Sequence, residues 1–329
     1  MTTTHPMSDE EVRAEFLRQR TTSLPRKTSG TKKTVAQVLE QLEALDGVRM
    51  ASDAAPVATC DELTTSALED LFANRTCALR IPRFATTPTC EELAPWITRG
   101  PLRTWGGTDT SYGAGIPLNA FSWSLELTEA YFREALPAMR AVRRACAGSM
   151  TPIDKLRLEL DELWLSGANV SRDNPFRRKM LAGLARVMRP DGLLEGIAQT
   201  EGLVHTDSSH LITEQQGLFS ANTYLEVPSR GGELNVFPLA MKQPEHLESL
   251  VRVIGFLLQH AFDDAHRDRV QRQLHALLPA PLTIKPEVGD LVILNTGRLH
   301  AVRGFAKGTR VTLQSFVRHR DGEPLQLFS

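Results

Sequence analysis

Cysteine is scarce in this sequence, long apolar runs are missing, and neither sign of charge dominates. The 4 cysteines among 329 residues form no CxxC pair and no dense pattern, which argues against a disulfide-stapled secreted domain. No stretch reaches the roughly eighteen apolar residues of a membrane helix, and the N-terminus lacks the apolar core of a signal peptide. We therefore expect reduced thiols, a cytoplasmic location and no membrane partner.

An excess of basic residues is also missing. Lys and Arg total 38 against 39 Asp and Glu, which gives a formal net charge of -1. Such a chain has no long-range field that would gather nucleic acid or anionic lipid. The basic stretch SRDNPFRRKM at 171–180 is most simply a solvated face. A nucleic-acid partner is therefore not expected. The 41% of hydrophobic residues is ample for a packed core.

The first 34 residues offer little apolar surface, so we expect a flexible arm at 1–34 ahead of a single domain at 35–329. Over 35–199 the apolar spacing is mostly helical. Candidate helices there lie at 35–45, 125–147 and 153–165, with a strand at 76–84. The glycine-rich and aromatic stretch 99–123 predicts a long loop that lines a site or simply connects elements, and it contains the candidate substrate contacts Trp105, Gly106 and Gly107.

From residue 200 to 329 the sequence pattern changes to short β-like runs separated by glycine and proline. This pattern is typical of an antiparallel sandwich or barrel. A helical insertion at about 244–278 interrupts these runs because its amphipathic sequence is too long for a hairpin loop. The fold class expected is α+β.

The stretch GLVHTD places His205 and Asp207 two residues apart within a β-like run. On a strand these two side chains point to one face, so they can offer one nitrogen and one oxygen ligand to the same ion. An H-x-D pair alone is weak evidence, because exposed polar residues often show this spacing. An open metal face for oxygen chemistry needs a second histidine as well.

His300 is the best candidate for that histidine. It follows GDLVILNTGRL, in which a turn signal precedes a buried strand and Gly297 interrupts the chain just before the histidine. The histidines at 246–275 belong to the helical insertion, and His210 is most simply a loop or supporting residue. The region around Arg298, beside the distal histidine, is a further candidate substrate contact.

Arg310 lies within a β-type run, where a cation is unusual, and Thr312 shares its face. A guanidinium binds a carboxylate through two hydrogen bonds, and a hydroxyl two residues away on the strand can add a third. This pair therefore favours a diacid that reaches the metal with one end and Arg310 with the other.

HTD at 205–207, His300 after GDLVILNTGR, and RVT at 310–312 resemble the His-x-Asp…His…Arg-x-Ser/Thr signature of the iron(II)- and 2-oxoglutarate-dependent oxygenases. The resemblance covers roughly residues 200–320. It implies a double-stranded β-helix, also called a jelly roll or cupin-like core, with flanking helices. It also implies Fe(II) held by His205, Asp207 and His300, with 2-oxoglutarate held by Arg310 and Thr312.

Two further residues are candidates for the cosubstrate site. Asn222 and Tyr224 alternate onto one face of the next β-like run and can hydrogen-bond 2-oxoglutarate, although a structural role in the barrel fits both equally well. The segment RGGELNVFP at 230–238 resembles a strand and turn common among small-molecule members, and supports the fold more than the chemistry.

The resemblance implies a dioxygenase that uses molecular oxygen to hydroxylate an unactivated C–H bond of a small molecule, such as an amino acid or a natural-product intermediate, with release of succinate and carbon dioxide. Desaturation, cyclisation and epoxidation stay open, since the ligands do not encode where the substrate radical lies. Halogenation is disfavoured because Asp207 occupies the chloride position of the related halogenases. The rival classes are a cosubstrate-free cupin-like metalloprotein, a non-catalytic binding protein, and a nucleic-acid demethylase or protein hydroxylase. The sequence leaves the oligomeric state open.

Overall fold

The computed structural model describes residues 52–53, 55–105, 109–112, 125–146, 148–173, 177–190, 200–207, 216–239 and 264–329. The expected arm at 1–34 and the expected helix at 35–45 lie outside these ranges. The helices are α3 (Thr65–Phe72), α4 (Thr87–Arg99), α5 (Leu125–Ala145), α6 (Pro152–Leu163) and α9 (Asp264–Leu277). None of the described helices is long and apolar enough to cross a membrane.

Local sequence explains where these helices begin. α6 starts after Thr151, whose hydroxyl accepts a hydrogen bond from the Asp154 N–H at 3.0 Å, and Pro152 takes the first helical position. α4 uses Thr86 in the same way, with its hydroxyl accepting from the Thr89 N–H. A threonine cap satisfies an N–H that the helix itself leaves unpaired, and proline fits the first turn because no N–H is needed there.

The strands form two sheets. The large sheet runs in the order β1-β2-β10-β7-β12-β6-β4-β3, with β13 paired to both β12 and β5, and the small sheet runs β11-β8-β9. All pairs are antiparallel except β1 with β2 and β5 with β13. The strands are β1 (Val57–Thr59), β2 (Ala78–Ile81), β3 (Leu102–Trp105), β4 (Asp109–Tyr112), β5 (Ala168–Val170), β6 (Leu184–Met188), β7 (Gln216–Glu226), β8 (Leu234–Val236), β9 (Leu282–Ile284), β10 (Leu291–Asn295), β11 (His300–Val302), β12 (Arg310–Arg320) and β13 (Leu325–Phe328).

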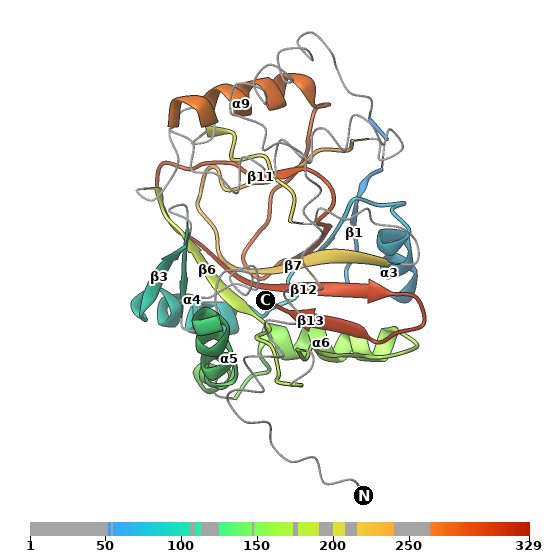
Figure 1. Cartoon of the computed structure of the whole chain (residues 1–329), viewed down its shortest axis with the longest axis vertical. Coiled ribbons are helices and arrows are strands. Elements are labelled where there is room, and N and C mark those ends of the chain that lie inside the picture. The colour runs from blue at the N-terminus through green and yellow to red at the C-terminus, as the bar shows by residue number, and fades with distance from the viewer. Residues whose placement is uncertain are drawn as a thin grey trace, which may run out of the picture.

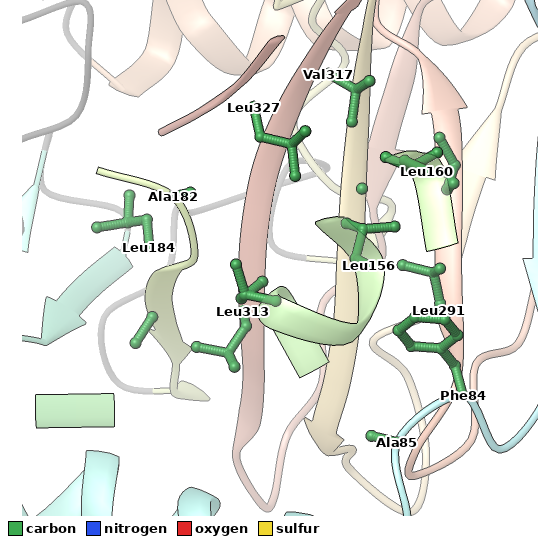
Figure 2. Close-up of a cluster of buried hydrophobic side chains, with 14 of the residues drawn as sticks. Phe84, Ala85, Leu156, Leu160, Ala182, Leu184, Leu291, Leu313, Val317 and Leu327 are labelled. Carbon is green, nitrogen blue, oxygen red and sulfur yellow. The ribbon is translucent and has the colours of Figure 1, made fainter. Parts of the chain in front are cut away.

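One face of the large sheet packs against helices, and Figure 1 shows α4, α5 and α6 along it. Leu156 and Leu160 project from α6 towards Leu313 of β12 and Leu291 of β10 (Figure 2), and all four are fully buried. Burying a leucine side chain stabilises a fold by about 1.5–3 kcal/mol. This apolar layer therefore fixes the plane of the sheet that carries the site.

The opposite face of the large sheet looks towards the small sheet. Val292 and Leu294 of β10 pack there with Leu234 and Val236 of β8 and Ile284 of β9. Beside this apolar patch lies a polar area that we call the interior wall: Arg186 of β6, Ser220, Asn222 and Tyr224 of β7, and Arg310, Thr312 and Gln314 of β12. Cross-strand pairing puts these side chains on one face, since Thr312 lies opposite both Tyr224 and Arg186.

The structure adds strands that the sequence analysis missed and corrects one expectation. β3 and β4 pair as a hairpin inside the stretch expected to be a loop, and β5, β6 and β13 were not anticipated. The run GLVHTD is not a regular strand, because His205 forms only an isolated bridge, to His300. Within the expected insertion, the structure describes α9, while 244–263 lies outside the described residues.

Candidate metal centre

Three side chains with metal-ligand atoms converge where β11 begins. One ligand atom each of His205, Asp207 and His300 lies within 4.8 Å of the others. The backbone N–H of each histidine donates to the carbonyl of the other at 3.0 Å, and the Asp207 N–H donates to the Thr296 carbonyl at 3.2 Å. The bridge sets the imidazole centroids 4.3 Å apart. Backbone pairing thus brings together residues far apart in the sequence.

Each imidazole is oriented by a backbone carbonyl two residues earlier. Nδ1 of His205 donates to the Leu203 carbonyl at 2.9 Å, and Nδ1 of His300 donates to the Arg298 carbonyl at 2.9 Å. Because a carbonyl only accepts, each neutral ring carries its proton on Nδ1 and has the lone pair of Nε2 available for a metal. Nε2 of His205 lies 3.8 Å from Asp207 Oδ1, and Nε2 of His300 lies 3.5 Å from Asp207 Oδ2.

The electrostatics of the centre keep Asp207 ionised. Burial raises its pKa, but the hydrogen bond with His300 and the electrostatic interactions with His300, His205 and Arg186 outweigh this, and the net pKa lies below the ordinary value. Burial and the neighbouring His300 lower the pKa of His205 to about 4, so its ring is neutral at pH 7. For His300, burial lowers the pKa, but the hydrogen bond with Asp207 and the charge of Asp207 raise it by more. The net pKa of His300 therefore lies above the ordinary value. The centre therefore attracts a cation.

The three ligand atoms suit a small divalent ion with open positions. Bonds of about 2.1 Å at right angles separate neighbouring ligand atoms by about 3 Å, which is close to the 3.5 and 3.8 Å between the imidazoles and Asp207. Two histidines and one carboxylate on one side of an ion are the ligand set of non-haem iron(II) oxygenases. Only small side-chain movements are needed to bind such an ion.

A buried ion pair supports the segment that carries His300. Nη1 of Arg298 lies 2.6 Å from Asp53 Oδ2, and the arginine side chain is 1% exposed. Nη2 of Arg298 also donates to Asn74 Oδ1 at 3.4 Å. Arg298 was a candidate substrate contact, and in the structure its side chain pairs with Asp53. Its side chain anchors the turn whose carbonyl orients His300.

A glutamine of α9 supports the segment that carries His205. The amide of Gln271, itself 1% exposed, accepts from the Val204 N–H at 2.8 Å and donates to the Val204 carbonyl at 3.4 Å. Gly202, with φ +87°, lets this segment approach Val302 so closely that an added Cβ would collide with the Val302 backbone. Gln271 of α9 and Gly202 together fix the position of the segment that carries His205 and Asp207.

Arg310 lies on the interior wall and is buried. Its Nη2 donates to the Tyr224 hydroxyl at 3.2 Å, and its Nη1 lies 3.2 Å from the Met188 sulfur. Among the residues that the structure describes, Nε of Arg310 and Oγ1 of Thr312 are buried without a hydrogen-bond partner. Buried polar groups normally have partners, and these two donors lie two residues apart on the same face of β12, so together they indicate a site for a polar ligand.

Asn222 serves a network within the same wall. Its Nδ2 donates to Ser220 Oγ at 3.0 Å, and Nε2 of Gln314 donates to the same oxygen at 2.9 Å. Nη1 of Arg186 donates to Gln314 Oε1 at 2.9 Å. Sequence reasoning missed Arg186 and Gln314, although a cation between apolar residues in LARVM is the signal that identified Arg310.

The remaining candidate residues fall into two groups. His210, Gly106 and Gly107 lie outside the described residues, as does the side chain of Trp105. In the basic stretch 171–180, Arg178 contacts Asp173 at 2.8 Å and Glu129 at 2.7 Å. That pairing agrees with a solvated face.

No protein-family profile matches the sequence, and no curated protein matches it. Solved structures do resemble it. One is an N-substituted L-amino acid dioxygenase from Burkholderia ambifaria AMMD, at 15% identity over 80% of this chain and 91% of that one, with a TM-score of 0.44. HygX from Streptomyces hygroscopicus, with nickel and 2-oxoglutarate bound, has 16% identity, coverages of 80% and 89% and a TM-score of 0.39. A 2OG-Fe(II) oxygenase family oxidoreductase from Burkholderia pseudomallei has 12% identity, coverages of 82% and 97% and a TM-score of 0.36. These likenesses are too distant to assign an activity.

Proposed function

We propose that this protein is an iron(II)- and 2-oxoglutarate-dependent dioxygenase that hydroxylates a C–H bond of a small molecule. The observation that carries the proposal is the convergence of His205, Asp207 and His300 within 4.8 Å. The second support is the pair of buried, unpartnered donors on Arg310 and Thr312. In this proposal the two facing sheets form a double-stranded β-helix, with the site between them.

His205, Asp207 and His300 would hold Fe(II). Asp207 supplies the negative charge, and the carbonyls of Leu203 and Arg298 hold the two imidazoles in the tautomer that presents Nε2. With Fe(II) and 2-oxoglutarate bound, the site would supply oxygen activation coupled to oxidative decarboxylation of 2-oxoglutarate to succinate and carbon dioxide. Asp207 leaves no chloride position of the kind found in halogenases.

Arg310 and Thr312 would hold the distal carboxylate of 2-oxoglutarate. The guanidinium offers charge-assisted hydrogen bonds, and the Thr312 hydroxyl adds a donor on the same face of β12. Tyr224 orients the guanidinium through its hydroxyl and lies under it, with its ring centroid 4.9 Å from the arginine Cζ. In this assignment Tyr224 acts on Arg310, whereas Asn222 acts on the network of the wall.

The substrate in this proposal is a small metabolite, with molecular oxygen as the other partner and no nucleic acid or membrane involved. Hydroxylation is the outcome we favour, and desaturation, cyclisation or epoxidation would follow from a different substrate position over the same ligands. A cytoplasmic location agrees with four free cysteines. Burial raises the pKa of Cys77, Cys90 and Cys146 to about 11, so these thiols stay protonated.

Succinate release tests the proposal. Purified protein with Fe(II), 2-oxoglutarate and oxygen should release succinate slowly without a primary substrate, and faster when a metabolite library contains one. His205→Ala or Asp207→Ala should abolish this release because each removes a ligand. Arg310→Ala should mainly raise the 2-oxoglutarate concentration required, by about a hundredfold if a buried charged pair worth about 3 kcal/mol is lost.

Two exposed residues provide matched controls. Asp321→Ala removes a carboxylate from a turn, and Arg320→Ala removes a guanidinium that is 56% exposed at the end of β12. Both should keep normal turnover. Succinate release that persists in Asp207→Ala would refute the ligand assignment. Metal binding with no response to 2-oxoglutarate would instead support the cosubstrate-free class.

A further inference from the structure

Met188 places a thioether against the guanidinium of Arg310. It is the last residue of β6 and lies opposite Arg310 in the pairing of β6 with β12. Its sulfur lies 3.2 Å from Nη1 of Arg310. Met188 is half-buried, whereas Arg310 is only 6% exposed. A side chain that can be oxidised, and that is partly open to small solutes, is therefore in direct contact with the buried cation.

The hydrogen-bond donors beside this sulfur are poorly satisfied. A thioether is a weak acceptor, so Met188 gives Nη1 of Arg310 only a weak partner. Within the described part of the chain, Nε of Arg310 and Oγ1 of Thr312 are buried with no partner. A stronger acceptor at this place would therefore gain hydrogen bonds that the thioether does not make, since buried donors are costly when unpaired.

Oxidation turns the side chain of Met188 into such an acceptor. Hydrogen peroxide transfers one oxygen atom to a thioether: a sulfur lone pair forms the S–O bond, the O–O bond breaks, and the rest of the peroxide leaves as water. The sulfur loses two electrons and becomes a sulfoxide, which is polar. The flexible methionine side chain lets the new oxygen turn towards the guanidinium. This oxygen then competes with any carboxylate that needs the same donors.

We propose that Met188 is an oxidation site whose sulfoxide hydrogen-bonds Arg310 and thereby weakens the binding of 2-oxoglutarate. The inference rests on the proposed function, in which Arg310 and Thr312 take the distal carboxylate of this cosubstrate. The sulfoxide is neutral, so it occupies donors without removing the charge of Arg310. The modified protein therefore still binds 2-oxoglutarate, but at a higher concentration. Methionine sulfoxide can be reduced enzymatically, so the effect is reversible.

Peroxide treatment of the metal-free protein tests this inference. The protein is treated with hydrogen peroxide, freed of peroxide with catalase, and analysed by peptide mass spectrometry for the gain of one oxygen at Met188. It is then loaded anaerobically with Fe(II) and titrated with 2-oxoglutarate while the charge-transfer absorption is followed. The half-saturating concentration should rise about tenfold, as expected when one hydrogen bond to a charged group is lost. Methionine sulfoxide reductases should restore the original value.

Met188→Leu and Met150→Leu form a matched pair of variants. Leucine keeps the approximate volume of methionine and removes the sulfur. Met150 lies between α5 and α6 and is 56% exposed, so peroxide should oxidise it readily. The half-saturating concentration of Met188→Leu should be the same before and after peroxide. In Met150→Leu it should rise as much as in the wild type.

Three results would overturn the inference. Peroxide that oxidises Met150 in the wild type and leaves Met188 unmodified would show that the sulfur is not accessible. Oxidised Met188 with an unchanged half-saturating concentration would show that the sulfoxide does not compete at Arg310. A rise in Met188→Leu equal to that in the wild type would assign the effect to another residue. If untreated wild type with iron bound gives no absorption with 2-oxoglutarate, the proposed function itself is refuted.

Discussion

The two imidazoles of the centre hydrogen-bond each other's backbones, yet their chain segments are held in different ways. His300 begins a strand paired with β8, and the turn before it is held by the ion pair between Arg298 and the distant Asp53. His205 lies in a segment without a regular strand, and one glutamine of α9 contacts its neighbour Val204 through two hydrogen bonds. One ligand depends on the sheet, the other on a helix.

The difference predicts unequal tolerance to substitution. Removing one partner of a buried ion pair leaves an uncompensated charge and costs about 3–5 kcal/mol. Removing a neutral hydrogen-bonded side chain costs about 1–3 kcal/mol. Substitutions in the contacts that hold the His300 segment should therefore mainly lower folding stability. Substitutions in the contacts that hold the His205 segment should mainly weaken metal binding by the folded protein.

Arg298→Met should have the largest effect. We expect a loss of about 3–5 kcal/mol in the free energy of unfolding, measured by urea denaturation, because Asp53 loses its partner in a largely buried site. Asp53→Asn combined with Arg298→Met should recover part of this loss, since no charge is then left unpaired. A single variant as stable as wild type would show that the ion pair does not support the turn.

Gly202→Ala should rank second. At φ +87° an alanine is strained, and its Cβ would meet the Val302 backbone, so we expect about 1–3 kcal/mol of destabilisation together with weaker metal binding. Gly322→Ala is the control, since Gly322 has φ +72° but open space around it. Equal losses in the two variants would mean that backbone strain, and not the close approach to Val302, sets the cost.

Gln271→Ala should change stability least and metal binding selectively. We expect a loss of about 1–2 kcal/mol in unfolding free energy and a several-fold weaker affinity for Mn(II), measured by calorimetry, because the H-x-D edge is then free to shift. Arg272→Ala changes an adjacent side chain that is 63% exposed and should leave both quantities unaltered. An unchanged metal affinity in Gln271→Ala would show that α9 does not help to position the metal ligands.

In the metal-free protein, His205 and His300 should titrate at different pH values. The pKa of His205 is lowered to about 4 and that of His300 is raised. The unfolded state therefore binds the His205 proton first as the pH falls, and stability from neutral His205 is lost between about pH 6.5 and 4. Stability from protonated His300 is instead lost as the pH rises through its raised pKa. A pH titration followed by NMR of the two rings should therefore give a higher pKa for His300 than for His205. The reverse order would contradict the hydrogen-bond geometry.

The sequence was informative where chemistry depends on residue type and short spacing. The i and i+2 spacing of Arg310 with Thr312, and the strand that begins at His300, could be anticipated from alternation and turn signals. Asp53, Asn74 and Gln271 could not, because their roles arise from contacts with segments far away in the chain. β3 and β4 were missed because glycines and polar residues obscure so short a hairpin.

Anaerobic titration of the protein with Fe(II), and then with 2-oxoglutarate, tests the central claim most directly. The account predicts one iron per chain and a charge-transfer absorption on adding 2-oxoglutarate. The absorption should be absent in Asp207→Ala and should require far more 2-oxoglutarate in Arg310→Ala. An absorption of full strength in Asp207→Ala, or none in the wild type with iron bound, would contradict it.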